Sequence, residues 1–553
     1  MRIALVGPFA GPALSDAFGF PSTGAGALPP GYPGAQLMCV LAKALVERGH
    51  QVAAITTDYS TPIAELAPFR LIKGGGLHAY FCPQRPRSFR SAHGMRGRAL
   101  DLFRYERDGL RAAIADFAPD VAHAHWTYEF VWAALDSGTP TLATAHDSPL
   151  KVLRFMPNLY RLVRYFMARR VLARCRHLTA VSPDLERDLR HLTPAQISVV
   201  ANPISNPILQ APGCVAQSIQ SKTLVMVLNG WIALKNGAAA LRAFSLARRD
   251  DPGLRLVCFG SGYEPDGEAQ RWAAAQGFLD GVEFRGPTPH PLVLEQMRSS
   301  LALLHPSRNE ACSMSIAEAM SLGLPAIGGR STDGVPWQLE QGRAGVLVDV
   351  NDAHAMADAI VALSRDRTRW HQISLAARAR ARQLFAVDSV VDQYLSLYAT
   401  VLRDARTGPS GRSPVSPMPN TDADLIMGLP ISRQTPAQVL KVMEQGIARR
   451  EIGRYVSITN TESMYHGLRD AQHGAHIRNA DFSLCDGVGV IVAGYAWGHR
   501  IERYNGPVLQ LDASDHGRSR QWRHFFYGGK EGVAEEMARR LQERYPGLIV
   551  CGS

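Results

Sequence analysis

Two acidic residues frame a short apolar segment in the second half of the chain. The stretch SRNEACSMSIAEAMSLGLPAIGG, residues 307–329, carries Glu310 and Glu318 eight positions apart, just ahead of glycine-rich apolar sequence. Two carboxylates can accept hydrogen bonds from the hydroxyl groups of a sugar or a ribose. A structural alternative exists, because Ser315 and Glu318 fit a capping box, in which Glu318 only returns a hydrogen bond to the backbone of Ser315. The spacing alone leaves both interpretations open.

A helix start lies between the two acids and could hold an anion. We expect the helix that carries Glu318 to open at Ser313, Met314 and Ser315. The first amides of a helix are free to donate hydrogen bonds, and the helix dipole makes this end positive, so phosphate groups bind there. The arrangement would suit a nucleotide diphosphate-sugar, with one acid meeting the sugar and the other the ribose.

Two further motifs could serve the same ligand. Lys235, in the segment NGWIALKNG, could neutralise a diphosphate leaving group. Gly260 and Gly262 flank a serine directly after a predicted strand, and glycine lets the backbone approach a phosphate closely. Lys235 could equally be an ordinary surface lysine, and a lone GxG occurs widely by chance. Neither motif identifies a site by itself.

The elements that must position these residues alternate short apolar runs with helical patterns, such as Ala35–Arg48, over the first 400 residues. This alternation is typical of βαβ units and parallel sheets. The predicted strands are Arg2–Val6, Val52–Thr56, Val121–His125, Thr141–Ala145, His177–Val181, Leu224–Leu228, Leu254–Phe259, Val282–Arg285, Leu301–His305 and Ala326–Gly328. They predict an α/β fold with two successive parallel-sheet domains, whose ligand binds in the crevice at the carboxyl ends of the strands.

These patterns divide the chain into five segments. Residues 1–203 and 204–387 are the two predicted Rossmann-like domains, and residues 388–405 are a helix that we expect to pack back on the first domain. Residues 406–424 are rich in proline, glycine and serine, a composition typical of a linker. Residues 425–553 are a further α/β segment.

Composition limits the function classes. The 553 residues are 46% hydrophobic and 20% charged, which is typical of a soluble globular protein with several domains. The eight cysteines form no close pairs, which argues against a zinc site or a disulfide framework and favours a reducing cytoplasm. We find neither a secretory signal nor an apolar run near the roughly 18 residues of a membrane helix. The net charge of +11 favours an anionic partner, but no signature supports nucleic acid.

One basic segment could bind a membrane surface. Residues 151–176 contain no acid and eight basic residues, which are Lys151, Arg154, Arg161, Arg164, Arg169, Arg170, Arg174 and Arg176. Apolar residues are interleaved with them, and such a helix can lie on an anionic membrane. The alternative is a core helix with a solvated basic face. A second acid-free cluster in the same predicted domain favours the membrane; its members are Arg85, Arg87, Arg90, Arg96 and Arg98.

Taken together in this order, the motifs of residues 1 to about 405 resemble a glycosyltransferase of family 4 with the two-domain GT-B fold. The matching text is GYPGAQLMCVLAKALVERGHQV, DVAHAHW, TAHD, LTAVSP, VVANPI, LKNG, CFGSG and the block ending in EAMSLGLPAIGG. The resemblance implies that Glu310 binds sugar hydroxyls, Glu318 the ribose and Lys235 the diphosphate of a nucleotide-sugar. It implies that Ser313, Met314, Ser315, Gly260, Gly262 and Gly34 line the nucleotide-sugar site.

The resemblance also implies a mechanism. His146 would line the junction between sugar and acceptor, although a histidine that closes a buried strand is often only hydrogen-bonded in place. Family members retain the anomeric configuration and are generally metal-independent. We therefore expect no metal and no cofactor, with a UDP- or GDP-linked sugar as co-substrate and electrostatic stabilisation of the departing diphosphate as the main catalytic device.

Two departures from the family pattern concern this site. The family usually places an arginine shortly before the lysine, where this chain has Asn229-Gly230-Trp231. The family's glycine-rich turn often ends in proline-glutamate, where this chain has Val335-Pro336-Trp337. Either change could alter the choice of sugar donor or weaken phosphate binding.

Residues 425–553 resemble the WecG/TagA/CpsF family, whose members transfer sugars such as N-acetylmannosamine to a lipid-linked acceptor. The matching text is IMGLPISRQTPAQVL, VSITNTESMYHGLRD, NADFSLCDGVGVIVAGYAWG, RYNGPVLQLD and RHFFYGGKEGVAEEMARRLQERYPGL. The resemblance implies that Asp486, followed by Gly487, is the catalytic base. It also implies that Thr459, Asn460 and Thr461 form the substrate-binding turn. A plain tight turn is the alternative for Asp486-Gly487.

The second module matches the family only as far as a last predicted strand, Leu548–Cys551. Family members continue into further strands and a basic appendage, so we expect this module to be incomplete and leave its activity open.

The two resemblances predict a cytoplasmic enzyme, peripheral on the inner face of the plasma membrane. It would add sugars to a polyprenol-diphosphate-linked saccharide for surface polysaccharide, and fusion of two modules would raise the effective concentration of one anchored acceptor. A non-catalytic scaffold that keeps the fold is an alternative from another class. A sugar-nucleotide epimerase on the same fold is a further alternative.

Overall fold

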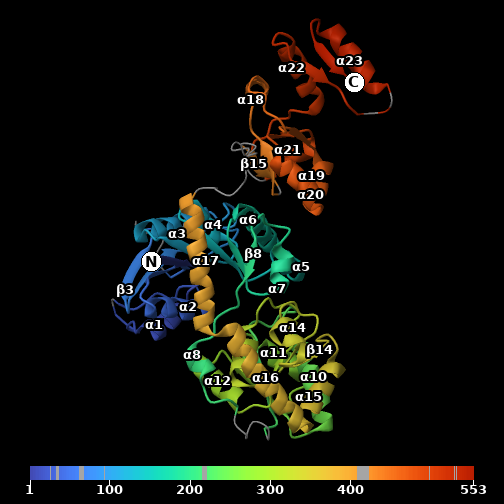
Figure 1. Ribbon diagram of the computed structural model, residues 1–553. Helices are drawn as coiled ribbons and strands as arrows, with labels where there is room; N and C mark the ends of the chain where they lie inside the picture. Colours follow the sequence, from blue (N-terminus) through green and yellow to red (C-terminus); the bar gives the residue numbers. More distant parts are fainter. Residues whose placement is uncertain are drawn as a thin grey trace. The chain divides into compact units, whose positions relative to one another are not determined.

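The chain forms two compact units, residues 1–408 and 409–553 (Figure 1). Each unit has its own hydrophobic core. The computed structural model describes residues 1–24, 26–32, 36–60, 68–92, 94–214, 221–407, 423–426, 428–496, 499–528, 530 and 532–553. Gly34 and residues 408–422 of the predicted linker lie outside the described residues.

The first lobe of unit one is built on an eight-stranded sheet with the order β3-β4-β2-β1-β5-β6-β7-β8. Its strands are β1 (Arg2–Val6), β2 (Gln51–Asp58), β3 (Arg70–Gly74), β4 (Leu77–Pro83), β5 (Val121–His125), β6 (Thr141–Ala145), β7 (Leu178–Ala180) and β8 (Ile197–Val199). Neighbouring strands run parallel except for β3 and β4, an antiparallel hairpin at the sheet edge that sequence periodicity did not indicate.

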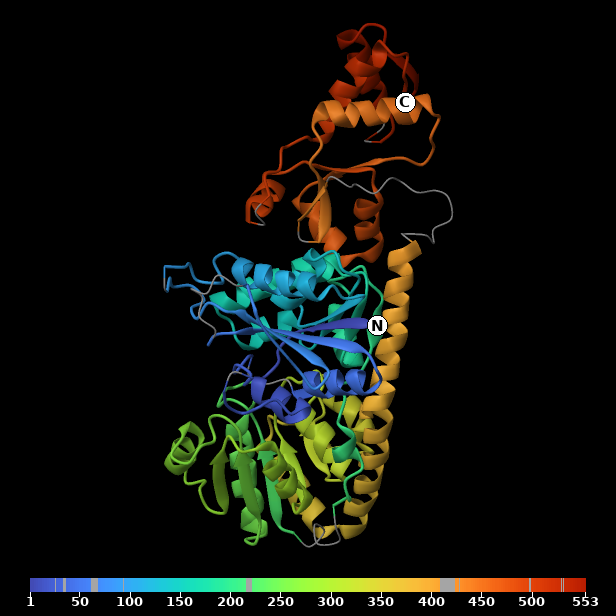
Figure 2. The same ribbon diagram turned by 90° about the vertical axis from the view of Figure 1, so that its left-hand side faces the viewer.

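Helices cover both faces of this sheet, which explains why its central strands are almost completely buried (Figure 2). Ile3, Leu5 and Val6 of β1 are completely buried. The helices of this lobe are α1 (Gly11–Phe18), α2 (Gln36–Glu47), α3 (Arg104–Phe117), α4 (Glu129–Asp136), α5 (Pro149–Phe155), α6 (Leu159–Arg174), α7 (Pro183–Leu189) and α8 (Asn206–Leu209).

The second lobe is built on a six-stranded parallel sheet with the order β11-β10-β9-β12-β13-β14. Its strands are β9 (Thr223–Val227), β10 (Arg255–Phe259), β11 (Val282–Gly286), β12 (Ala302–His305), β13 (Ala326–Gly329) and β14 (Val346–Val348). Its helices are α10 (Gly237–Asp250), α11 (Glu268–Gln276), α12 (His290–Arg298), α13 (Met314–Leu322), α14 (Val335–Gln338), the short 3-10 helix η1 (Glu340–Gly342), α15 (Ala353–Arg365) and α16 (Arg367–Phe385). The prediction of two successive parallel-sheet domains is confirmed.

The last helix of unit one, α17 (Val387–Thr407), packs on the first lobe although it follows the second lobe in sequence (Figures 1 and 2). Val390, Val391 and Tyr394 are buried in one hydrophobic core with residues of β1 and α2. Arg48, just after α2, forms ion pairs with Asp388 at 3.1 Å and Asp392 at 2.5 Å. The chain therefore crosses from the first lobe to the second and back.

Within its described residues, unit two carries three two-stranded sheets. The strands are β15 (Ala423–Ile426), β16 (Leu429–Ser432), β17 (Val456–Thr459), β18 (Phe482–Cys485), β19 (Arg523–Phe525) and β20 (Ile549–Gly552). The helices are α18 (Pro436–Ala448), α19 (Thr461–Arg469), α20 (Ala471–Asn479), α21 (Val488–Ala496), α22 (Gly506–Arg518) and α23 (Val533–Arg544). The pairs β17–β18 and β19–β20 run parallel, and β15–β16 runs antiparallel.

The predicted basic membrane segment differs from expectation in its shape and its charge. It is split between α5 and α6 at Met156–Asn158. Arg164 is buried and pairs with Glu129, and Arg174 pairs with Asp136 at 2.7 Å. Part of the predicted positive charge is thus neutralised by acids that lie elsewhere in the sequence.

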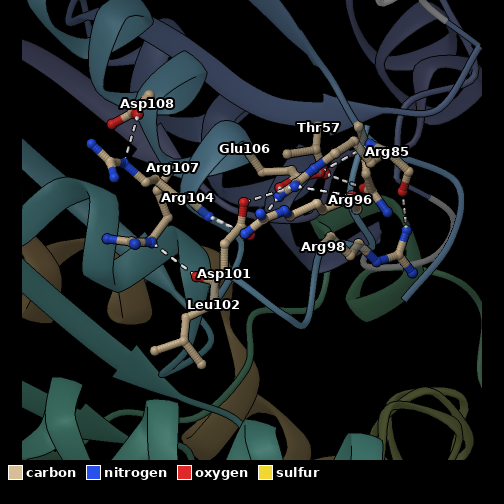
Figure 3. A network of polar contacts seen from close by, with 11 residues as sticks. Thr57, Arg85, Arg96, Arg98, Asp101, Leu102, Arg104, Glu106, Arg107 and Asp108 are labelled. Atoms are coloured by element: carbon tan, nitrogen blue, oxygen red, sulfur yellow. Dashed lines mark hydrogen bonds and ion pairs between the residues drawn. The ribbon is translucent and has the colours of Figure 1, made fainter. Parts of the chain in front are cut away.

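In the second predicted basic cluster, Arg85 is paired with two acids and does not form part of a basic surface (Figure 3). Arg85 is buried, and its guanidinium forms bonds to both oxygens of Asp101 at 2.8 Å and to both oxygens of Glu106 at 2.6 and 3.0 Å. Arg98 donates to the backbone carbonyl of Arg85 at 2.6 Å. Arg85 therefore holds the fold together and contributes nothing to a basic surface.

All eight cysteines are free. Across the described ranges, every helix is too short or too polar to span a lipid bilayer.

Candidate active site

Lys235 and Glu310 form an ion pair in the second lobe, with Nζ of the lysine 2.5 Å from Oε1 of the glutamate. Glu310 follows β12, and Lys235 lies in the loop between β9 and α10. Strands β9 and β12 are parallel neighbours, so the segments after their carboxyl ends meet at one edge of the sheet. The two residues predicted to serve the sugar and the diphosphate are thus brought together.

Three hydrogen bonds to backbone carbonyls fix the loop that carries Lys235. The side-chain amide of Asn236 donates to the carbonyls of Pro306 at 3.2 Å and Val350 at 2.7 Å. The amide of Arg308 donates to the carbonyl of Leu234 at 2.9 Å. Because these bonds tie the loop to the segment after β12, the Lys235 amine is positioned beside Glu310 by the fold.

A buried histidine lies between Glu310 and the start of α13. Nε2 of His305 lies 3.6 Å from Oε1 of Glu310, and Nδ1 of His305 lies 3.4 Å from the hydroxyl of Ser315. Burial opposes ionisation of Glu310, but the imidazole of His305 and the charge of Lys235 outweigh it and lower the pKa of the carboxyl to about 2. Glu310 is therefore a carboxylate at neutral pH.

Helix α13 begins as predicted, but its cap is Ser313 and the capping-box alternative is wrong. The Ser313 hydroxyl accepts from the amide of Ile316 at 3.4 Å, which makes Ser313 the N-cap. The amide of Ser313 itself donates to the side chain of Gln338 at 2.9 Å. No described residue accepts a hydrogen bond from the amides of Met314 and Ser315. These two amides are free for an anion at the positive end of the helix.

Glu318 lies on the same helix and pairs with a histidine that the sequence did not single out. Nε2 of His290, the first residue of α12, lies 2.9 Å from Oε1 of Glu318. This hydrogen bond outweighs burial and raises the pKa of His290. Glu318 therefore has a side-chain partner other than Ser315.

The two predicted glycines shape the turn after β10. Both have left-handed backbones, with φ 105° at Gly260 and 87° at Gly262. A Cβ at Gly260 would lie 1.9 Å from the carbonyl oxygen of Leu228, and one at Gly262 would lie 2.8 Å from the amide nitrogen of Trp231. Glycine is required here because the turn packs against the loop that leads to Lys235, so these residues act on the site through its neighbouring loop.

Val335, Pro336 and Trp337 begin helix α14. The residue just before this helix, Gly334, is hydrogen-bonded to the backbone of Glu310. The amide of Gly334 donates to the carbonyl of Glu310 at 3.0 Å. A Cβ at Gly334 would lie 1.9 Å from the carbonyl oxygen of Ala311, so the close approach needs glycine.

His146 lies in the first lobe, directly after β6, at the carboxyl edge of its sheet. Its Nε2 lies 2.8 Å from Nδ1 of His125, the last residue of β5. Burial lowers the pKa of His146 to about 4, so its imidazole is neutral at physiological pH. The residue is not a base that titrates near neutrality.

The two lobes meet beside this edge. Lys151 of α5 pairs with Asp188 of its own lobe at 2.7 Å and with Asp333 of the second lobe at 2.5 Å. Ser148, two residues after His146, lines a small cavity together with Asn309 and Ala311, which flank Glu310. The loop that follows His146 therefore faces the segment that carries Glu310.

In unit two the predicted residues gather at the ends of β17 and β18. These strands are parallel, and the amide of Asp486 donates to the carbonyl of Thr459 at 3.0 Å. Asp486 and Gly487 lead from β18 into α21 without an intervening turn, so the tight-turn alternative is wrong. Nη2 of Arg503, which sequence reasoning missed, lies 3.6 Å from Oδ1 of Asp486.

The three predicted substrate-binding residues at the end of β17 differ in how accessible they are to a substrate. Thr459 is fully buried, and its hydroxyl lies 2.8 Å from that of Ser483, so it links the two strands. Asn460 caps α19 by accepting from the amide of Ser463 at 2.8 Å, and Thr461 is the first residue of that helix. A Cβ at Gly487 would lie 3.7 Å from Cβ of Asn460, which brings this turn next to Asp486.

Three known families match the chain. Residues 35–206 match "Glycosyltransferase Family 4", residues 221–366 match "Glycosyl transferases group 1", and residues 425–553 match "Glycosyl transferase WecG/TagA/CpsF family". The first two matches fall in the two lobes of unit one, and the third falls in unit two.

Curated relatives match different parts of the chain. N-acetyl-alpha-D-glucosaminyl L-malate synthase of Bacillus anthracis is 26% identical over 66% of this chain and 94% of its own length. N-acetylglucosaminyldiphosphoundecaprenol N-acetyl-beta-D-mannosaminyltransferase of Bacillus spizizenii is 28% identical over 18% of this chain and 39% of its length. Exopolysaccharide phosphotransferase SCO2592 of Streptomyces coelicolor is 30% identical over 34% of this chain, and the chain spans only 19% of that protein.

Solved structures share the fold of unit one. Sucrose-phosphate synthase of Thermosynechococcus elongatus superposes with a TM-score of 0.56 at 18% identity, covering 73% of this chain and 99% of the synthase. HepE of Anabaena, solved with UDP-glucose, superposes with a TM-score of 0.53 at 15% identity over 72% of this chain and 100% of HepE. The chain therefore belongs in its first unit to the family 4 glycosyltransferases with the GT-B fold, and carries a domain of the WecG/TagA/CpsF family in its second.

Proposed function

We propose that unit one transfers a hexose from a UDP- or GDP-linked sugar to a saccharide acceptor, with retention of anomeric configuration. The observation that carries the proposal is the Lys235–Glu310 ion pair beside the free amides at the start of α13. A cation, two backbone donors and a helix dipole converge on one edge of the sheet, as a departing diphosphate requires. The family matches and the name of the Bacillus anthracis relative support the same reaction class.

Lys235 can bind a phosphate oxygen of the ligand while it remains paired with Glu310. An ammonium group has three N–H donors, so Nζ can keep its bond to Glu310 and still donate to a phosphate oxygen. Glu310 keeps a second carboxylate oxygen for a hydroxyl of the sugar, and Glu318 with His290 meets the ribose. The acceptor oxygen bonds to the anomeric carbon as the carbon–phosphate-oxygen bond breaks, and the leaving phosphate takes the acceptor's proton on the same face. Neither a metal nor a further cofactor enters this scheme.

The test is a transfer assay with full-length protein and a panel of UDP- and GDP-sugars, with and without a polyprenol-diphosphate-linked saccharide. We expect one sugar donor to be consumed. Consumption by wild type and its loss in Glu310→Gln, with unchanged circular dichroism, would support transfer at this site. If the folded wild type consumes none of them, the proposal of a non-catalytic scaffold replaces it. Conversion of the donor to an epimer without release of nucleotide would identify an epimerase instead.

We propose that unit two acts on the same class of lipid-linked acceptor, with Asp486 as base. The match to the Bacillus spizizenii transferase, whose name specifies a diphosphoundecaprenol-linked substrate, supports this. Arg503 beside Asp486 would meet the diphosphate of the acceptor. Asp486→Asn should abolish transfer of N-acetylmannosamine from its UDP form and spare transfer by unit one. Asp515→Asn, a change at an exposed residue of α22, should change neither. Wild-type protein without this second transfer would refute the role of unit two.

A lipid-linked acceptor needs access to a membrane, and the bend between α5 and α6 supports peripheral attachment to an anionic inner membrane face. This bend exposes a set of large apolar side chains, which are Leu150, Phe155, Leu159, Leu162 and Phe166. Arg154 lies exposed among them. Apolar side chains and a cation together suit the headgroup region of an anionic bilayer.

Vesicle sedimentation tests this attachment. The protein should pellet with phosphatidylglycerol vesicles more than with phosphatidylcholine vesicles. Leu159→Ser should weaken the binding, whereas Leu375→Ser should not, because Leu375 is about equally exposed, 59% against 61%, but lies on α16 of the second lobe. Equal binding of both variants would place the membrane contact elsewhere.

A further inference from the structure

Two histidines at the ends of neighbouring strands are bonded ring to ring. Nδ1 of His125 lies 2.8 Å from Nε2 of His146, and the rings stack with their centroids 5.1 Å apart and their planes at 21°. His125 ends β5 and is buried, whereas His146 follows β6 and is only partly buried. His125 is thus the more deeply buried member of the pair.

The pair shares a single proton. Burial lowers the pKa of His125 well below its usual value and that of His146 to about 4, so both rings are neutral at physiological pH. A neutral imidazole has one N–H donor and one acceptor nitrogen. The proton between the rings therefore belongs either to Nδ1 of His125 or to Nε2 of His146.

The second ring nitrogen of His125, which does not contact His146, decides between these two arrangements. This nitrogen, Nε2, is buried and has no hydrogen-bond partner among the residues that the structure describes. If the shared proton belonged to His146, His125 would carry its own proton on Nε2, as a buried N–H without an acceptor. Such orphaned donors are rarer in folded proteins than unpaired acceptors. The proton therefore belongs to Nδ1 of His125.

We propose that His125 is a positioning residue that fixes the tautomer of His146, so that His146 carries its proton on Nδ1 and offers the ligand a hydrogen-bond donor. This rests on the proposed function, in which His146 lines the junction of sugar and acceptor. A neutral N–H donor suits an oxygen of the transferred sugar or of the departing phosphate. It cannot remove the acceptor's proton, because its acceptor nitrogen is occupied by His125. The proton of the acceptor must therefore go elsewhere, as it does when the leaving phosphate takes it.

The surroundings hold His125 in this role. A Cβ at Gly7, which follows β1, would lie 3.2 Å from Cβ of His125, so the glycine makes room for this side chain. The ring of His123 lies 4.2 Å from that of His125, centroid to centroid. His123 is itself fixed by the hydroxyls of Tyr398 and Thr144, each at 2.7 Å. His125 has little freedom to turn its Nδ1 away from His146.

Nitrogen NMR on the full-length protein reads the tautomer directly. In ¹⁵N-histidine-labelled wild type we expect a protonated Nδ1 and an unprotonated Nε2 for His146. His125→Asn keeps an N–H donor close to the position of Nδ1 and should preserve this tautomer. His125→Phe keeps the ring but removes the donor, so the His146 proton should redistribute towards Nε2. His177→Asn in the same lobe is the control, because the ring of His177 pairs with Asp404.

Kinetics provides the second readout. Loss of one such hydrogen bond should lower kcat/KM by about tenfold in His125→Phe, whereas His125→Asn should stay within a few-fold of wild type. A proton on Nε2 of His146 in wild type would overturn the proposal. So would equal losses in both variants with the His146 tautomer unchanged. If the expected tautomer is found in a protein that transfers no sugar, the proposed function fails and the tautomer assignment stands.

Discussion

Lys235 and Glu310 lie 75 positions apart in the chain, yet the lysine amine lies 2.5 Å from a carboxylate oxygen of the glutamate. The contact exists because β9 and β12 are parallel neighbours whose following loops meet at one edge. In the proposed reaction the pair orients both groups before a ligand arrives, which avoids reorganisation during catalysis. Removal of either side chain should therefore disturb the position of the other.

Lys235→Ala should lower kcat/KM for sugar transfer by about 10²- to 10³-fold, because it removes a charge aimed at the departing diphosphate. Steady-state assays with saturating acceptor measure the change. Lys222→Ala is the matched control, since Lys222 lies exposed in the same lobe and pairs with Asp251. A loss of activity in Lys222→Ala as large as that in Lys235→Ala would indicate a general effect of charge.

The depressed pKa of Glu310 predicts how stability depends on pH. Its folded pKa of about 2 lies below its ordinary value of 4.5, so the carboxylate stabilises the folded state above pH 4.5 and loses this contribution as the pH falls towards 2. The difference in unfolding free energy between wild type and Glu310→Gln should be constant from about pH 6 to 8. It should shrink by about 3 kcal/mol at most below pH 4.5. Urea titrations at several pH values measure this difference, and no shrinkage would show that the carboxyl is not held ionised.

The His290–Glu318 pair predicts the opposite pH dependence. The pKa of His290 is raised, so its bond to Glu318 stabilises the fold below the unfolded pKa of about 6.5 and loses this contribution as the pH rises through the folded pKa. Glu318→Gln should therefore destabilise the protein more at pH 6 than at pH 9, by on the order of 1 kcal/mol. An NMR titration of His290 should show its pKa falling in the variant. An unchanged His290 titration would contradict the pairing.

Glu106→Ala should destabilise unit one by about 3–5 kcal/mol, because it leaves the buried guanidinium of Arg85 with one acid in place of two (Figure 3). Asp108→Ala, two positions away on the same helix, should change the unfolding free energy by less than about 0.5 kcal/mol because its ion pairs are exposed. Denaturant unfolding compares the two. Similar values for both variants would show that the Arg85 cluster carries no special stability.

The contact between Lys151 and Asp333 predicts a link between lobe closure and binding of the sugar donor. Lys151 also pairs with Asp188, but only Asp333 belongs to the second lobe. Asp333→Asn should therefore raise the radius of gyration in small-angle scattering and raise KM for the sugar donor by about fivefold, the equivalent of about 1 kcal/mol. Asp188→Asn keeps the contact between lobes and should do neither. The same response from both variants would rule out a link specific to the lobes.

Strand positions could be predicted because the central strands are short, mainly apolar runs, and β1, β5 and β6 agree with the predicted bounds. The antiparallel hairpin β3–β4 was missed, since exposed Arg70 and Lys73 interrupt the apolar pattern of β3. The capping box failed because Ser313 and Ser315 both fit a helix start, and only the fold decides between them. Arg85 was misjudged because its acids lie 16 and 21 positions away, and pairing at such separations depends on tertiary structure.

The same limit applies to the candidate site. Glu310, Glu318 and Lys235 were found from their motifs, whereas His290 and His305 were not. His290 lies 28 positions from Glu318 and has no motif of its own. His125 was visible in DVAHAHW, but its bond to His146 depends on the register of β5 against β6, in which His125 faces Thr144. Sequence periodicity predicts where the strands lie but not how neighbouring strands are aligned with each other.

Helix α17 has a consequence for how the protein is made. Val390, Tyr394 and Tyr398 complete the core around β1 and β2, strands that leave the ribosome more than 300 residues earlier. During synthesis the nascent first lobe must therefore wait, with an apolar face uncovered, until the whole second lobe and α17 have emerged. This order makes the growing chain a client for chaperones, and a messenger cut before codon 387 would encode an aggregation-prone product.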